Sequence, residues 1–163
     1  MPKSSSRSSL SRNVAHGVLA GLAGTVVMTA FQKLVEMPIT GRADSYAPAD
    51  FAAKVLPLQS DTRRDQVNYA THFALGTMWG AAYGVAAHAG LRGRGGVAAV
   101  FATVYTSDVL LNTALGLYQP SAWSRQDWAV DVVDKLVQAA ATGATFDYVL
   151  DRATNSDRSP TRS

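Results

Sequence analysis

The chain has 163 residues, of which 47% are hydrophobic and 17% are charged, and its formal net charge is +3. This length suits one domain, and the charged fraction lies below the roughly 25% of an ordinary soluble domain. The chain has no cysteine, which excludes disulfides, thiolate nucleophiles, iron–sulfur clusters and thiolate-bound zinc. Its basic residues lie in termini and loops and form no aromatic-rich helix face, so we expect no nucleic-acid partner.

The uneven distribution of charge predicts the domain organisation. Residues 1–13 are rich in serine and basic residues, and residues 152–163 are polar, so both segments are predicted to be disordered tails. Residues 14–151 form the predicted structured domain. A cleaved signal peptide is the alternative for the first apolar stretch, but its apolar region would be shorter, and no A-x-A motif precedes Lys33.

Four segments of this domain are predicted to be membrane-spanning helices. Residues 14–32 carry no formal charge, and at about 1.5 Å per residue they would cross most of a hydrocarbon layer about 30 Å thick. Residues 66–91 are also uncharged and give the strongest signal, whereas the fourth segment contains several charges and gives the weakest. The predicted spans are residues 14–36, 67–91, 95–118 and 128–150.

The first loop, residues 37–65, is predicted to contain one short amphipathic helix. Pro48 suits a first helical turn, and Phe51 and Val55 recur at helical spacing. The predicted fold is therefore all-α, an integral membrane bundle of four up-down transmembrane helices that contacts the lipid bilayer. Lys and Arg are densest in the flanks on the side of the two termini, which predicts a multi-pass protein of the bacterial inner membrane with both termini cytoplasmic.

Glycines recur every fourth residue in the first two predicted spans. Each would cost about 1 kcal/mol in a water-exposed helix, whereas in a membrane a row of small residues lets two helices approach closely. A water-soluble bundle of glycine-rich helices is the alternative, but residues 73–87 offer almost no polar face. The predicted packing glycines are Gly17, Gly21, Gly76, Gly80 and Gly84.

Ionisable residues inside the predicted spans fall mostly in one half of the membrane. Spacings of three and four residues place neighbouring polar groups on one helix face, as with Asp108 and Asn112. An ionised group exposed to lipid costs several kcal/mol, so these faces are expected to point inward, where Lys33 or Lys135 would supply the counter-charge. The sequence predicts a shared polar pocket formed by Glu36, His72, Asp108, Asp131 and Asp134.

Two functions from different classes fit this pattern. A carboxylate and a histidine in a pocket of low dielectric can bind or pass protons, which predicts proton or cation sensing or conduction. The alternative is a structural membrane subunit that binds a second copy or another membrane protein through its glycine faces. No nucleophile lies beside a base in any hydrolase motif, so we expect no enzymatic activity.

No cofactor and no metal site are predicted. His16 and His88 lie near the same membrane face and could hold a haem between two spans, but interfacial histidines are the preferred interpretation. Hydrolytic zinc would need two or three well-spaced histidines, and only His72 lies near the acids.

Four groups of residues occur in an order and spacing that match a known family: Glu36-Met37-Pro38 with Arg42, Thr71-His72 with Tyr83, Gly116-Leu117 with Pro120, and Asp134. On these residues the chain resembles the uncharacterised bacterial four-span inner-membrane proteins typified by YagU. The resemblance covers most of residues 17–151, and it implies a membrane location and a link to acid tolerance. The chain departs from those relatives at Asp108 and near Gln138, where they have histidines, so a histidine-rich metal site is not expected.

Overall fold

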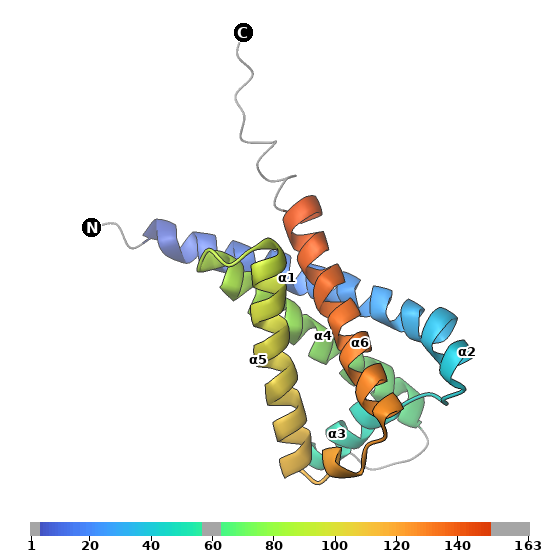
Figure 1. The fold of residues 1–163 in the computed structure, drawn as a ribbon. Coiled ribbons are helices and arrows are strands. Elements are labelled where there is room, and N and C mark those ends of the chain that lie inside the picture. Colours follow the sequence, from blue (N-terminus) through green and yellow to red (C-terminus); the bar gives the residue numbers. More distant parts are fainter. Residues whose placement is uncertain (1–3, 57–62, 151–163) are drawn as a thin grey trace.

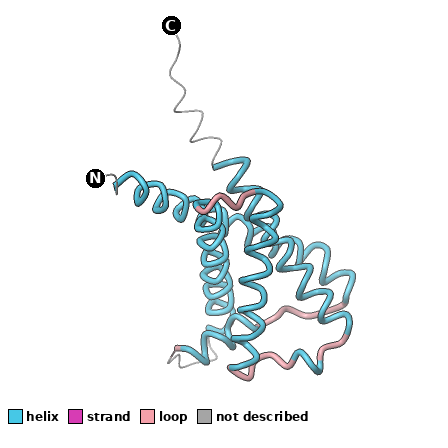
Figure 2. The backbone as a smooth tube through the Cα atoms, turned by 60° about the vertical axis from the view of Figure 1, so that its left-hand side comes forward, coloured by secondary structure: helices cyan, strands magenta, loops and turns pink. Residues whose placement is uncertain are grey.

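The computed structural model describes residues 4–56 and 63–150, and the regular structure within these ranges is all helical (Figures 1 and 2). The all-α class predicted from the sequence is therefore confirmed for this part of the chain. The predicted tail at 152–163 lies outside the described residues. Four long helices make up most of the fold: α1 (Ser4–Phe31), α4 (Arg64–His88), α5 (Gly93–Ala114) and α6 (Arg125–Ala144).

Two of the long helices continue into π-helical turns. After α1 the chain forms such a turn at Gln32–Glu36 and then the short helix α2 (Met37–Thr40). After α6 a second π-helical turn covers Thr145–Leu150. Single π-helical turns within helices are rare and occur often at functional sites. Both turns contribute acidic residues to the polar clusters described below.

The short helix predicted in the first loop is present as α3 (Ala47–Val55). Pro48 lies in its first turn, where a missing N–H costs no hydrogen bond. Its small residues Ala49 and Ala52 are buried, and α3 packs against α4. The first loop is therefore fixed to the helix that follows it.

Successive long helices run in opposite directions. The start of α1 meets the end of α4, where the Ser9 hydroxyl lies 3.2 Å from Nδ1 of His88. The start of α5 meets the π-helical turn that follows α6, where the Gly93 N–H donates to the Asp147 carboxylate over 2.8 Å. α1 packs mainly against α4 and also against α6, while α5 packs against α4 and α6 (Figure 1).

Glycines form the contact between α1 and α4. A Cβ added to Gly17 would overlap the carbonyl oxygen of Gly80, and one added to Gly21 would lie 2.9 Å from the Cα of Gly80. Gly76 and Gly84 are equally close to the backbone or side chains of α1. The five glycines expected to pack helices thus lie in one contact within the chain, with backbone against backbone.

Residues 4–13 correct the prediction of a disordered N-terminal tail, because α1 begins at Ser4. The physical reason is a tertiary contact that composition does not reveal. Asn13 is buried, and a Cβ on Gly84 would overlap its carbonyl oxygen. The start of α1 is therefore held by the end of α4.

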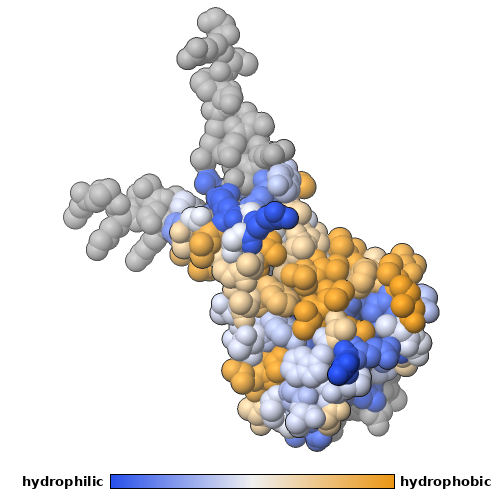
Figure 3. Space-filling model, in the orientation of Figure 1, coloured by the Kyte–Doolittle hydropathy of each residue, from blue (hydrophilic) through white to orange (hydrophobic). Residues whose placement is uncertain are grey.

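Large apolar side chains are exposed on all four long helices. The buried core is small and centres on Trp79, Tyr83 and Phe146. Figure 3 shows hydrophobic residues gathered over the middle of one face, with strongly hydrophilic residues toward the ends. The exposed apolar side chains include Leu19, Val26, Val27, Met78, Val85, Leu110, Leu111, Val133 and Leu136.

Two helical segments of the described chain are long and apolar enough to cross a membrane, Ser9–Thr40 and Gly93–Ala114. α4, which the sequence predicts as the strongest span, is not among them. The reason is that a segment without charge is not necessarily strongly apolar. α4 is rich in Gly, Ala, Tyr, His and Thr, and its first turn contains Arg64 and Asp65.

Candidate functional site

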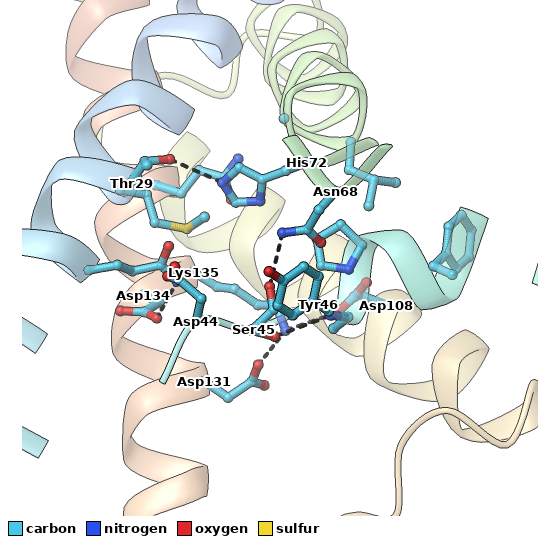
Figure 4. Close-up of a pocket in the computed structure, with 18 of the residues that line it drawn as sticks. Thr29, Asp44, Ser45, Tyr46, Asn68, His72, Asp108, Asp131, Asp134 and Lys135 are labelled. Atoms are coloured by element: carbon cyan, nitrogen blue, oxygen red, sulfur yellow. Dashed lines mark hydrogen bonds and ion pairs between the residues drawn. The ribbon is translucent and has the colours of Figure 1, made fainter. Parts of the chain in front are cut away.

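A cavity of about 440 Å³ lies between the long helices and the first loop, and it is partly open to the surface. Its walls come from α1 and the turn that follows it, from α3, and from α4, α5 and α6. The structure brings all the residues of the predicted pocket and both predicted counter-charges to these walls (Figure 4). They are Lys33, Glu36, His72, Asp108, Asp131, Asp134 and Lys135.

Lys135 joins two of the acids in an ion-pair cluster. Its Nζ lies 3.0 Å from Oδ2 of Asp108 on α5 and 2.6 Å from Oδ1 of Asp131, one turn earlier on α6. Asn112 donates to Oδ1 of Asp108 over 3.0 Å. All three charged side chains are largely shielded from water, so the pairing offsets much of their desolvation cost.

Two aromatic rings complete the surroundings of this ammonium group. Nζ of Lys135 lies 5.2 Å from the ring centroid of Tyr105 and 5.5 Å from that of Tyr118. Such distances suit cation–π attraction. The sequence places Tyr105 three residues before Asp108, on the same helix face, whereas nothing in it connects Tyr118 with Lys135.

Asp134 is a buried carboxylate that is hydrogen-bonded to a neutral side chain. It is 6% exposed and accepts a hydrogen bond of 2.7 Å from Nε2 of Gln32 in the π-helical turn. Its other oxygen, Oδ1, is buried and has no hydrogen-bond partner. Within the described ranges no Lys or Arg lies at ion-pair distance from it. Its negative charge is therefore not directly compensated.

Glu36 lies at the end of the same π-helical turn. It is buried, and its Oε1 accepts a hydrogen bond of 2.7 Å from the hydroxyl of Thr40. Glu36, like Asp134, has a neutral partner at hydrogen-bond distance. Because the turn directs both Gln32 and Glu36 to the cavity wall, the acids from α1 and α6 face a common space.

His72 contacts α1 rather than an acid. Its Nε2 lies 3.2 Å from the Thr29 hydroxyl, and in the described part of the chain no carboxylate lies within hydrogen-bond distance of its ring. One turn deeper, Gln138 donates to the hydroxyl of Thr25 over 3.0 Å. The carboxylate and histidine of the predicted proton site thus share a cavity but not a hydrogen bond.

The first loop closes one side of the cavity through fixed polar contacts. Asn68 donates to the carbonyl of Ser45 over 3.0 Å and accepts from the N–H of Ala49 over 3.1 Å. Lys33 forms an ion pair with Asp44 of this loop. Lys33 therefore neutralises a loop acid, and Lys135 is the counter-charge for the deeper acids.

The mouth of the cavity contains a further hydrogen bond. The Tyr46 hydroxyl donates to Asp65 over 2.6 Å, and this bond to a carboxylate raises the pKa of Tyr46 above its ordinary value. Both residues line the cavity. This contact ties the start of α3 to the start of α4 at the cavity entrance.

Acidic side chains outnumber basic ones in the cavity lining. The lining contains six carboxylates and three Lys or Arg side chains, an excess of three negative charges with histidine neutral. Across residues 4–56 and 63–150, no group of three or more His, Asp or Glu side chains is arranged to hold a metal ion. The lining therefore favours a cationic ligand over an anionic one.

A second polar cluster lies at the opposite end of the helices, where the sequence predicts no site. The Tyr83 hydroxyl donates to Asp147 over 2.6 Å, and the N–H of Gly93 donates to the same oxygen. Tyr83 is 1% exposed. The cluster ties α4 to the start of α5 and to the turn after α6, which indicates a structural role.

His16 and His88, the two residues considered as haem ligands, lie in separate contacts. The ring of His16 packs edge-on against Phe146 at a centroid distance of 6.3 Å. His88 contacts Ser9.

Comparison of the chain with protein-family models, curated proteins and solved structures found no match to any of them.

Proposed function

We propose that the chain is a multi-pass protein of the bacterial inner membrane, with four spans and both termini in the cytoplasm. Two helices are long and apolar enough to cross a membrane. α4 and α6 would complete the bundle, because they alternate in direction with α1 and α5 and also expose large apolar side chains such as Val85 and Leu136. Exposed apolar area on every long helix suits contact with lipid.

The exposure of α5 supports this proposal. Leu110 is 65% exposed, and only 11% of the most apolar part of the helix is buried. A core helix of a protein in water would bury its apolar side chains. In a membrane the same surface is satisfied by acyl chains.

Within this membrane protein, the cavity binds protons or cations, for sensing or for conduction. The observation that carries this function is the buried carboxylate of Asp134, which has an unpartnered oxygen and, among the described residues, no Lys or Arg at ion-pair distance. Intramembrane acids are costly and are associated with proton and ion sites. A bound proton or cation would supply the missing positive charge. The resemblance to YagU-like proteins adds a role in acid tolerance to the proposal.

Infrared difference spectroscopy of the protein in lipid vesicles tests this function. Spectra recorded while pH or cation concentration is changed should contain a carboxyl band that disappears in Asp134→Asn. Asp50→Asn is the matched control, because Asp50 lies on α3 outside the cavity and pairs with Arg64 at the surface. A band that persists in Asp134→Asn, or no band at all, would overturn the proposed function.

The alternative function, a purely structural subunit, requires a surface that binds a partner. The glycine faces on which that alternative depends are covered by the contact between α1 and α4 of one chain. A partner would therefore have to bind elsewhere, for example on the exposed face of α5. The structure gives more support to the cavity than to assembly through the glycine faces.

A further inference from the structure

We infer that the cavity is a binding site for a compact organic cation, one that combines an ammonium group with an apolar or aromatic body. This inference rests on the proposed function, because it requires that the cavity accept positive charge. It goes further by naming the chemical class of the ligand. Three features of the cavity carry it: volume, the composition of its walls, and the position of its uncompensated acid.

The volume of the cavity exceeds what a proton or a bare inorganic ion requires. At about 440 Å³ it falls within the roughly 300–1,000 Å³ range of small-molecule sites. Such sites combine apolar walls with a few polar groups in fixed positions. The cavity therefore has room for an organic body beside the charged group.

The walls offer apolar and aromatic surface around the acids. Met28 and Trp79 are buried residues of α1 and α4 that line the cavity. Thioether and aromatic side chains make favourable contacts with organic groups, whereas they interact only weakly with a hydrated inorganic ion. Further apolar or aromatic side chains of the lining include Tyr46, Phe51, Tyr69, Leu75, Val104 and Tyr118.

The cluster at Lys135 shows how this cavity accommodates an alkylammonium group. There the lysine side chain occupies a space bounded by two carboxylates, Asp108 and Asp131, and by the rings of two tyrosines. Lys135 compensates one of the two negative charges there, and it pairs with both carboxylates. Asp134, the preceding residue, lies on the same wall with Oδ1 unpartnered. A ligand ammonium at Asp134 would form the second such pair.

Charge separates this ligand class from lipid or detergent chains, which would also enter an apolar cavity. A neutral occupant would leave the Asp134 carboxylate uncompensated, whereas an ammonium compound would pair with it. The discriminating comparison is therefore between a cation and a neutral molecule of the same shape. Phenyltrimethylammonium and tert-butylbenzene form such a pair.

The experiment is equilibrium dialysis of these two probes against the purified full-length protein in a neutral detergent. We expect saturable binding of phenyltrimethylammonium that is at least about tenfold tighter than that of tert-butylbenzene. This comparison uses the wild-type chain, so its outcome does not depend on the folding of any variant. Asp134→Asn should weaken cation binding by about tenfold or more, while Asp50→Asn should leave it unchanged.

Equal binding of the two probes, or no saturable binding of the cation, would overturn the inference. So would an Asp134→Asn variant that folds normally and keeps full affinity. The infrared experiment separates the two failures. If the Asp134 carboxyl band is present but phenyltrimethylammonium does not bind, the ligand class is wrong and the proton or cation function stands. If the band is absent as well, both proposals fail.

Discussion

The two ends of the contact between α1 and α4 differ sharply, although both lie on the same rows of residues spaced by four. Toward the start of α1, Gly17 and Gly21 lie against Gly80 with backbone touching backbone. Two turns further along α1, the same row carries Thr29, which meets His72 through side chains. At the first end the two helix backbones touch because glycine has no side chain, and at the second end the helices border the cavity.

This difference shows how a helix pair can be tight and still border a cavity. Small residues let helix backbones approach, and larger polar side chains on the same rows keep the next turns apart. The glycine contact holds the two helices together, and the polar end lines the cavity. Variants that alter either end should therefore have different effects.

The largest effect is expected at the polar end for Lys135→Met. Removal of the ammonium leaves Asp108 and Asp131 facing one another without a counter-charge, which should lower the free energy of unfolding by about 3–5 kcal/mol. Asp108→Asn is the matched comparison, because one lysine and one carboxylate remain paired. Equilibrium unfolding in mixed micelles measures both. A loss no larger in Lys135→Met than in Asp108→Asn would contradict the cluster.

At the tight end, Gly80→Leu should lower the free energy of unfolding by about 3 kcal/mol, because a side chain there collides with the backbone of Gly17. Gly95→Leu is the control, since no atom lies within 4 Å of a Cβ at this position. The same unfolding assay applies. Similar values for the two variants would show that α1 and α4 do not touch through their glycines.

A smaller loss is expected for Tyr83→Phe, far from the cavity. This variant removes the hydrogen bond to Asp147 and should lower the free energy of unfolding by about 1–2 kcal/mol. Binding of phenyltrimethylammonium should not change, because Tyr83 does not line the cavity. Altered binding at unchanged stability would argue against the structural role assigned to this cluster.

The smallest effect is expected at the exposed start of α6. Hydrogen bonds from the Ser124 hydroxyl and N–H hold the pKa of Asp127 below its ordinary value of 3.8. A pKa lowered on folding means that the stabilisation is complete above this value and is lost as pH falls through the lower folded value. The Tm of Asp127→Asn should therefore lie slightly below that of the wild type at neutral pH.

Acid should remove this Tm difference, since protonated Asp127 no longer accepts both bonds as a carboxylate. Scans of both proteins at about pH 7 and about pH 3 check this, with the difference narrowing at the lower pH. A difference that grows in acid would contradict the capping arrangement of Ser124 and Asp127.

Contacts within one helix could be predicted from the sequence, because helical spacing fixes which residues are neighbours. Lys135 follows Asp131 by four residues, and Asn112 follows Asp108 by four, and each of these pairs is bonded in the structure. The short helix in the first loop follows for the same reason. Its proline and apolar spacing are local signals.

Contacts between helices could not be predicted in this way, because they depend on how the helices are aligned. Gln32 donates a hydrogen bond to Asp134, which is over a hundred positions away, and it lies in a π-helical turn that no residue pattern predicts. The first turns of α1 likewise contact the far end of α4 at Ser9 and Asn13. The prediction that α4 is the strongest span has a different weakness, because a segment without charges can still be only weakly apolar.

Membrane extraction combined with sidedness labelling tests whether the protein is a membrane bundle with its cavity toward the outer face. Single cysteines at Ser60, between α3 and α4, and at Ser156, near the C-terminus, can be introduced into a chain that has none of its own. Alkaline carbonate would be applied to the membranes, and an impermeant thiol reagent to intact cells.

We predict that the protein stays in the membrane and that Ser60→Cys, but not Ser156→Cys, is labelled from outside. That result would place the first loop and the cavity mouth on the outer face. Release by carbonate would contradict the account, because the exposed apolar faces of α1 and α5 would then not contact lipid. Labelling of both cysteines, or of Ser156→Cys alone, would contradict the four-span arrangement.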